Sequence, residues 1–213
     1  MNEKHFWLLR AFPDNVPHYN VFLNASVVGL GWPRIGKLEK GIKPDELKQL
    51  FIENDYPAAD NAALGRRAGY FTRFVNEMKI GDVVFVPDNN GTVAVYEIKS
   101  DYYYDEKMSV HVPHLRKVQL LTTLKVHGLS KSLKRLLGNQ LSVINLDKAK
   151  EEITTLISSD SGVGQTTINR TNYSLITGEN KGKTVQIIIP NNASNQEIKV
   201  ILNDIIHELE GKL

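Results

Sequence analysis

The sequence predicts an α+β protein with a small β-barrel flanked by helices and a second small α/β domain at the carboxyl terminus. Short apolar runs typical of strands recur up to about residue 146, and runs with helical periodicity interrupt them. A Ser- and Gly-rich stretch at 158–167 has the composition of a linker. We therefore expect domains at 1–147 and 167–213, joined by a helix and a flexible linker at 148–166.

Two strands and two helices are expected in the first third of the chain. The strands are residues 5–11 and 26–30, with a short helical or irregular segment between them. A helix is expected from Pro44 to Asn54, because proline suits the first helical position and the two acids after it complement the helix dipole. A longer helix is expected at 61–78. Its apolar face is formed by Leu64, Ala68, Phe71, Val75 and Met78.

The middle of the chain contains the strongest hairpin signal. Apolar runs at 83–86 and 92–98 flank Pro-Asp-Asn-Asn-Gly, a loop rich in residues that tolerate positive φ. A further strand is expected at 114–121. Ser130 is expected to cap a short helix that ends at Gly138, and residues 141–146 are expected to close the sheet.

The last part of the chain is expected to form the second domain. An amphipathic helix at 149–157 leads into the linker, and strands are expected at 173–176 and 184–189. A helix with one aliphatic face is expected at 194–209. Because a unit of about 45 residues buries little surface alone, we expect it to dock on an effector nuclease subunit or to form a homodimer.

Charge favours nucleic acid as the partner. Residues 1–150 carry 21 Lys and Arg against 16 Asp and Glu, whereas residues 151–213 carry 5 against 8. No acid occurs between Lys107 and Leu146. The bases of this segment are Lys107, Arg116, Lys117, Lys125, Lys131, Lys134 and Arg135. An unopposed basic run suits a polyanion, although other segments could supply acids to the same surface.

Composition excludes several other classes of protein. The absence of cysteine excludes disulfides, thiolate zinc sites and thiol nucleophiles. No stretch approaches the roughly 20 apolar residues of a membrane span. His111 and His114 have no third ligand nearby, so no metal site is expected. We expect a cytoplasmic protein with no membrane association, no cofactor and no metal.

An ordered set of motifs resembles one family. The set comprises a Trp in the first strand, Gly-Leu-Gly-Trp32 after the second, Gly69-Tyr-Phe-Thr-Arg-Phe-Val-Asn-Glu-Met-Lys-Ile-Gly-Asp82 before the hairpin, Tyr96-Glu-Ile with a Tyr cluster after it, and His114-Leu-Arg-Lys-Val118. Over about residues 5–146 this order resembles the PUA/EVE-like, YTH-related amino-terminal DNA-recognition domain of Mrr-type restriction systems. The resemblance implies a curved barrel with a pocket for an extruded, often modified base. It also implies recognition of modified or foreign DNA in a restriction or defence context, without catalysis by this chain.

The base pocket is expected to contain aromatic side chains. Trp32 follows a strand end and precedes Pro33, so we expect a partly accessible indole that stacks on the base; a core position is the alternative. Trp7, in an apolar strand, is expected in the core. The family's second aromatic wall is missing after Val118, and the cluster Tyr102, Tyr103 and Tyr104 is expected to substitute for it, although alternation along a strand makes at least one of the three structural.

Basic residues are expected to hold the nucleic-acid backbone, because phosphate contacts position a protein on its target. The predicted contacts are Arg116, Lys117, Lys134 and Arg135. No residue is predicted to be catalytic.

The main enzymatic alternative lies in the hairpin, where Pro-Asp88 and Glu97-Ile-Lys99 match the PD-(D/E)xK pattern of restriction nucleases. Asp88 lies in the turn, roughly 25 Å of extended chain from Glu97, so the two cannot share a metal without a bend. A hairpin centred on the Asn-Asn pair after Asp88 instead predicts that Asp82 lies opposite Glu97, with Lys99 on the same face. A metal-dependent nuclease using Asp82, Glu97 and Lys99 is therefore one alternative function, and an RNA-binding PUA-like module is another.

Overall fold

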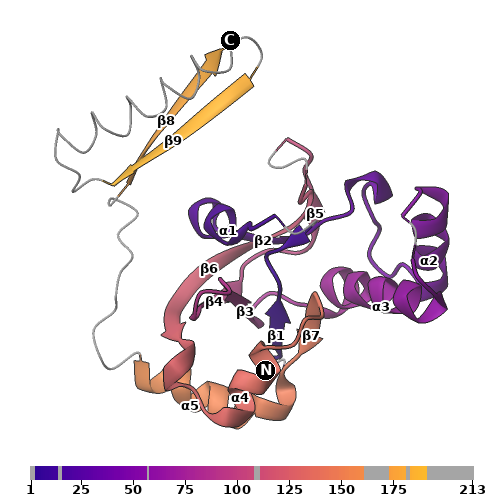
Figure 1. Cartoon of the computed structure of the whole chain (residues 1–213). Helices are drawn as coiled ribbons and strands as arrows, with labels where there is room; N and C mark the ends of the chain where they lie inside the picture. Colours follow the sequence, from indigo (N-terminus) through magenta and orange to yellow (C-terminus); the bar gives the residue numbers. More distant parts are fainter. Residues whose placement is uncertain are drawn as a thin grey trace. The chain divides into compact units, whose positions relative to one another are not determined.

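The computed structural model describes residues 3–13, 16–56, 58–107 and 111–160, and the backbone of 173–180 and 183–190. Two compact units divide the chain, residues 1–165 and 166–213. Each is described by itself below (Figure 1).

A curled sheet forms the centre of the first unit (Figure 1). Its strands are β1 (Phe6–Leu9), β2 (Val27–Leu30), β3 (Val83–Pro87), β4 (Thr92–Ile98), β5 (Tyr103–Tyr104), β6 (His114–Lys125) and β7 (Val143–Asn145). Their order is β2-β6-β4-β3-β1-β7, with β5 paired to β6. Neighbours are antiparallel except β1 and β3. Among the described strands the sheet therefore ends at β2 and β7, which makes it a half-barrel within a mixed α and β fold.

Helices α3 and α4 begin at residues whose side chains cap them. The α-helices are α1 (Tyr19–Ala25), α2 (Pro44–Glu53), α3 (Asn61–Phe71), α4 (Lys131–Leu137) and α5 (Lys150–Asp160), and short 3₁₀ turns occur at Pro33–Ile35, Val126–Gly128 and Asp147–Ala149. The Asp60 carboxylate accepts a bond from Ala63 N (2.6 Å), and the Ser130 hydroxyl accepts one from Leu133 N (3.1 Å). Helix α4 then ends at Gly138, so its predicted start and end are confirmed.

Helix α3 continues directly into a π-helix at Thr72–Glu77, so the predicted helix at 61–78 is present but changes its winding. The guanidinium of Arg116 on β6 donates to the carbonyls of Phe74 (2.8 Å) and Val75 (3.2 Å) in this π-helix. It also donates to the carbonyl of Ser100 (3.0 Å). Arg116 thus joins the helix to the sheet through carbonyls in the last turn of the helix, which have no partner within it.

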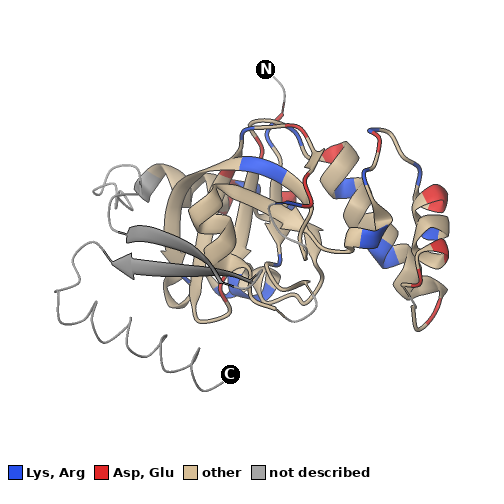
Figure 2. Ribbon diagram, turned by 90° about the horizontal axis from the view of Figure 1, so that it is seen from above, with Lys and Arg blue, Asp and Glu red and all other residues tan. Residues whose placement is uncertain are grey.

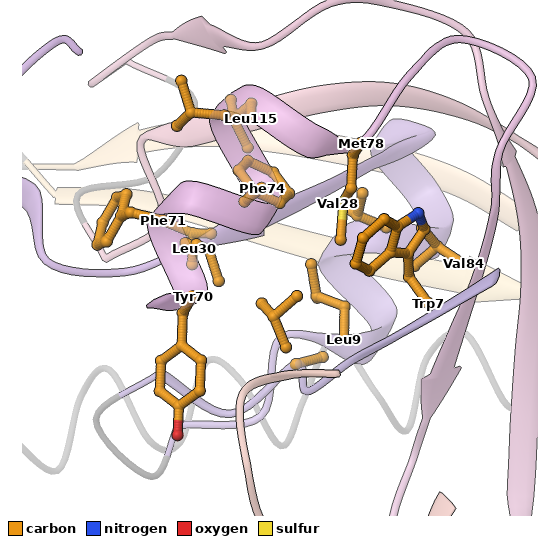
Figure 3. Close-up of a cluster of buried hydrophobic side chains, with 14 of the residues drawn as sticks. Trp7, Leu9, Val28, Leu30, Tyr70, Phe71, Phe74, Met78, Val84 and Leu115 are labelled. Carbon is orange, nitrogen blue, oxygen red and sulfur yellow. The ribbon is translucent and has the colours of Figure 1, made fainter. Parts of the chain in front are cut away.

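Alternating side chains of the strands enter two apolar clusters. In β1, Trp7 and Leu9 belong to the cluster under α2 and α3, whereas Phe6 and Leu8 belong to the cluster under α4 and α5. Figure 3 shows Trp7 beside Val84 and Met78 in the first cluster. Trp7 is 2% exposed, which confirms its predicted core position.

Asp82 ties the corner before β3 to β1. Its Oδ1 accepts from His5 N (3.1 Å), and its Oδ2 accepts from Trp7 Nε1 (2.9 Å) and Lys79 N (3.0 Å). The carboxylate is buried, and these three N–H donors offset the free-energy cost of removing it from water.

The second unit contains a hairpin of β8 (Tyr173–Asn180) and β9 (Lys183–Pro190), in which Tyr173 pairs with Pro190. Both strands were predicted and are confirmed. The predicted helix at 194–209 and the linker from residue 161 lie outside the described residues. The predicted helix after residue 148 is α5, whose Ile153 is buried in the second cluster of the first unit. None of the helices described above has the length and apolar character that crossing a membrane requires.

Candidate nucleic-acid interface

Trp32 lines a cavity of about 280 Å³. The cavity lies where segments far apart in the sequence meet: Arg10 after β1, Gly29 to Trp32 at the end of β2, Asn89 in the β3–β4 turn, and Gln140 and Ser142 before β7. These residues combine an aromatic side chain with main-chain, amide and hydroxyl groups and one cation.

Trp32 has a left-handed backbone, with φ 62° and ψ 57°. For a bulky residue this conformation costs on the order of 1–2 kcal/mol, and such strain is concentrated at functional sites. The indole packs edge-on against Phe51 (5.8 Å between ring centroids) and lies nearly parallel to Tyr70 (6.4 Å). The residue as a whole is nevertheless only partly buried.

A buried histidine holds the Trp32 backbone in place. Leu38 N donates to the Tyr102 hydroxyl (3.2 Å), which donates to His114 Nδ1 (2.9 Å). This order leaves the hydrogen on Nε2, which donates to the Trp32 carbonyl (3.3 Å). Burial lowers the pKa of His114 to about 4, so the ring is neutral at pH 7.

The predicted tyrosines lie behind Trp32 and do not line the cavity. Tyr102 and Tyr104 pack on His114, with ring centroids at 6.0 Å and 5.1 Å. The Tyr104 hydroxyl also contacts the Pro33 carbonyl (3.0 Å), and Tyr103 packs on the first apolar cluster. The structure therefore places Trp32 at the cavity. Tyr102 and Tyr104 contact the histidine that holds Trp32, and Tyr103 packs against the core.

A second cavity, of about 390 Å³, shares Arg10, Asn89 and Gln140 with the first and adds Lys134. Arg10 donates to Asn89 Oδ1 (2.5 Å) and to the carbonyls of Asn139 (2.8 Å) and Leu137 (3.3 Å) at the end of α4. Partial burial lowers its pKa.

Neither cavity is lined by an acid among the described residues. The neighbouring Asp88 directs its Oδ1 to the backbone N–H groups of Asn90 (2.7 Å) and Thr92 (2.9 Å) in its own turn. Between them, the two cavities therefore carry two cations, Arg10 and Lys134, which donate hydrogen bonds to the Asn89 amide oxygen and to main-chain carbonyl groups.

The four residues predicted to contact the nucleic-acid backbone differ in their exposure. The prediction for Arg116 is wrong, because its side chain is 1% exposed and bound to three carbonyls inside the protein. Lys117 and Arg135 are exposed, and Lys134 is half-buried with its Nζ donating to the His127 carbonyl (2.8 Å). Helix α2 carries three acids and Lys48, whereas the charged residues of α3 are Arg66 and Arg67 (Figure 2). Lys134 and Arg135 lie in the acid-free segment.

The predicted carboxylate pair of the nuclease alternative is also wrong. Val83, and not Asp82, lies opposite Glu97, and Ile98 N donates to the Asp82 carbonyl (2.9 Å). A register shift of one residue places a side chain on the other face of the sheet. Asp82 is consequently buried at the β1 corner, while Glu97 pairs with Lys99. In the part of the chain with described side chains, no group of three His, Asp or Glu residues could hold a metal.

Sequence reasoning missed Arg10, Asn89 and Gln140. The available signals were an arginine directly after an apolar strand and an asparagine in a turn that tolerates positive φ; Asn89 has φ 62°. Neither signal predicts that Arg10, Asn89 and Gln140 line the same cavity.

Comparison with known proteins found one family model, described as "Domain of unknown function (DUF8426)", which matches residues 10–145. No curated protein and no solved structure matched the chain. The matched span includes every residue that lines the two cavities and excludes α5 and the second unit. Because the match covers more than half of the 213 residues, this chain belongs to the DUF8426 family.

Proposed function

We propose that this domain binds nucleic acid without cleaving it and takes one unstacked base into the cavity beside Trp32. The observation that carries the proposal is a partly exposed tryptophan, held in a strained backbone conformation at a small cavity with polar walls. Proteins that read an extruded base provide an aromatic face for stacking and a few polar groups for its edge. A cavity of about 280 Å³ is at the lower end of small-molecule sites, which suits a single base.

The second cavity supplies a place for the sugar-phosphate backbone. It adjoins the first through Arg10, and Lys134 adds a second cation. Phosphate contacts need cations without acidic competitors, and no acid lines either cavity among the described residues. We assign DNA rather than RNA, and a PUA/EVE-like role in cytoplasmic restriction or defence, on the sequence resemblance alone.

Tryptophan fluorescence tests base binding directly. Trp7 is 2% exposed, so quenching by added nucleic acid reports on Trp32. The probes are unmodified and modified DNA duplexes, single-stranded DNA and RNA. Stacking on an aromatic side chain is worth about 1–3 kcal/mol, so Trp32→Ala is expected to weaken binding about 5- to 150-fold. Because variants at position 32 lack the reporting indole, their affinities are measured by the fluorescence anisotropy of dye-labelled probes, with the wild type measured in the same way. Trp32→Phe, which keeps an aromatic face, is expected to retain most of the affinity.

Thermal melting of the same variants separates binding from folding. A Trp32→Ala protein that melts normally and binds like the wild type would refute the proposal, as would the absence of quenching by every probe. Binding by RNA alone would move the proposal to the RNA-binding alternative.

Salt dependence tests the backbone contact. Affinity is expected to fall as salt rises, and Lys134→Gln is expected to reduce the logarithmic slope by about 0.7–0.9, the contribution of one phosphate. Lys131→Gln is the matched control, because Lys131 lies on the same helix, is exposed and lines neither cavity. Equal slopes for the wild type and Lys134→Gln would remove Lys134 from the interface.

A further inference from the structure

The main chain at the end of β2 is left without strand partners on one side. Strand β2 is the last strand of the described sheet and pairs with β6. Val118 N donates to the Ser26 carbonyl (2.9 Å), so Ser26 and Val118 form a hydrogen-bonded pair. In antiparallel strands such pairs alternate with non-bonded pairs. Val28 and Leu30 therefore bond to β6, whereas the N–H and C=O groups of Gly29 point away from it. Gly31 directly follows the last residue of β2 and, in the described sheet, has no pairing partner on β6.

Gly29 and Gly31 are buried and both line the Trp32 cavity. A glycine has no side chain, so its contribution to the wall is main chain. Within the described part of the chain, neither residue forms a hydrogen bond outside the β2–β6 pairing. Buried backbone N–H and C=O groups almost always have a partner. We therefore expect a molecule bound in the cavity to provide partners for these groups.

Side chains at these two positions are excluded by packing. A Cβ atom on Gly29 would lie 2.6 Å from Val112 Cγ1 and 2.7 Å from the His114 carbonyl. On Gly31 it would lie 2.9 Å from Pro13 Cβ. Glycine is therefore the residue that fits at both positions, and each contributes only main chain to the cavity wall.

We infer that the free main-chain edge of Gly29 and Gly31 reads the Watson–Crick edge of the base that stacks on Trp32, an inference that rests on the proposed function. In an antiparallel edge, the N–H and C=O of one residue lie side by side and offer one donor and one acceptor. Every nucleobase carries a neighbouring acceptor and donor on its Watson–Crick edge, and proteins read this edge in unpaired bases. The ligand class is therefore a nucleotide whose base is unpaired, since pairing occupies this edge.

The main-chain edge differs from the side-chain amides of Asn89 and Gln140 in the same cavity. An amide side chain can flip and exchange its donor and acceptor, whereas the order of donor and acceptor along a strand is fixed. Specificity set by Gly29 and Gly31 thus depends on the fold and not on a rotamer.

The test uses the full chain labelled with ¹⁵N and five-nucleotide single-stranded DNA probes. The central position carries a normal base, 5-nitroindole, which stacks but lacks the hydrogen-bonding edge, or no base. With normal bases, the amide protons of Gly29 and Gly31 are expected to shift downfield, while those of Gly41 and Gly65, outside the cavity, stay unchanged. The 5-nitroindole probe is expected to quench Trp32 without these shifts and to bind about 5- to 30-fold more weakly, as expected for one or two lost hydrogen bonds.

The outcomes separate this inference from the proposed function. Quenching of Trp32 by normal bases without shifts of the two glycines would overturn the inference and leave the proposed function intact. No quenching by any probe would overturn both. Shifts of Gly29 and Gly31 with an extended peptide, and not with DNA, would identify the edge as a site of strand addition and also overturn both.

Discussion

Lowering the pH from 7 to 5 is expected to destabilise the first unit through His114, because this ring is neutral and fully buried in the folded protein. Its two ring nitrogens are already engaged with the Tyr102 hydroxyl and the Trp32 carbonyl. The other rings that face it, those of Phe71 and Tyr104, carry no compensating negative charge. Protonation would therefore place an uncompensated charge in the core.

The magnitude follows from the difference between the two pKa values. The folded-state pKa of His114 is about 4, against an ordinary value of 6.5, so the unfolded chain binds the proton more tightly. The stabilisation is fully present above pH 6.5 and is lost progressively as the pH falls to about 4. At about 1.4 kcal/mol per pKa unit, the complete loss is on the order of 3 kcal/mol, and about 2 kcal/mol is lost by pH 5.

Urea unfolding at pH 7 and pH 5, followed by tryptophan fluorescence, measures this loss. His114→Gln is the control, since it replaces a titrating ring by an amide that does not titrate; the difference between the two proteins isolates His114 from carboxylates that titrate at lower pH. The reasoning would be refuted if the free energy of unfolding of the wild type fell between pH 7 and 5 by no more than that of His114→Gln.

Three further outcomes are expected. Asp82→Ala should lower the free energy of unfolding by at least about 3 kcal/mol in urea titrations, because three N–H donors lose their acceptor at roughly 1–3 kcal/mol each; a loss below 1 kcal/mol would contradict this. Arg116→Met should lower the urea midpoint but leave the salt slope of DNA binding unchanged, since the guanidinium is buried; a reduced slope would return Arg116 to the interface. Gel assays with Mg²⁺ or Mn²⁺ should show no DNA cleavage, and cleavage abolished by Glu97→Ala would reverse that conclusion.

Local signals in the sequence were enough to predict most elements of the first unit. The hairpin of β3 and β4, the start of α2 at Pro44 and the caps of α4 depend on residues within a few positions of each other. The prediction that Asp82 shares a face of the sheet with Glu97 depended on the hairpin register. The predicted register was wrong by one residue, which placed Asp82 on the wrong face.

Long-range packing decided the features that the sequence did not reveal. Arg116 looks like its exposed neighbour Lys117 in a basic run, but alternation along β6 turns it inward to the π-helix, whose irregular winding no local signal predicts. The convergence of Arg10, Asn89 and Gln140 depends on the order of strands in the sheet. Trp32 could be placed at the end of a strand because its signal, an indole between an apolar run and a proline, is local; its role in base binding stays a prediction.

The left-handed backbone of Trp32 also has a consequence for the evolution of this position. Glycine or asparagine at this position would relieve the torsional penalty. Either substitution would also remove the packing of the indole on Phe51, Tyr70 and Phe71. Members of the DUF8426 family with glycine or asparagine at this point in the chain would have lost both the backbone strain and the aromatic residue at the cavity.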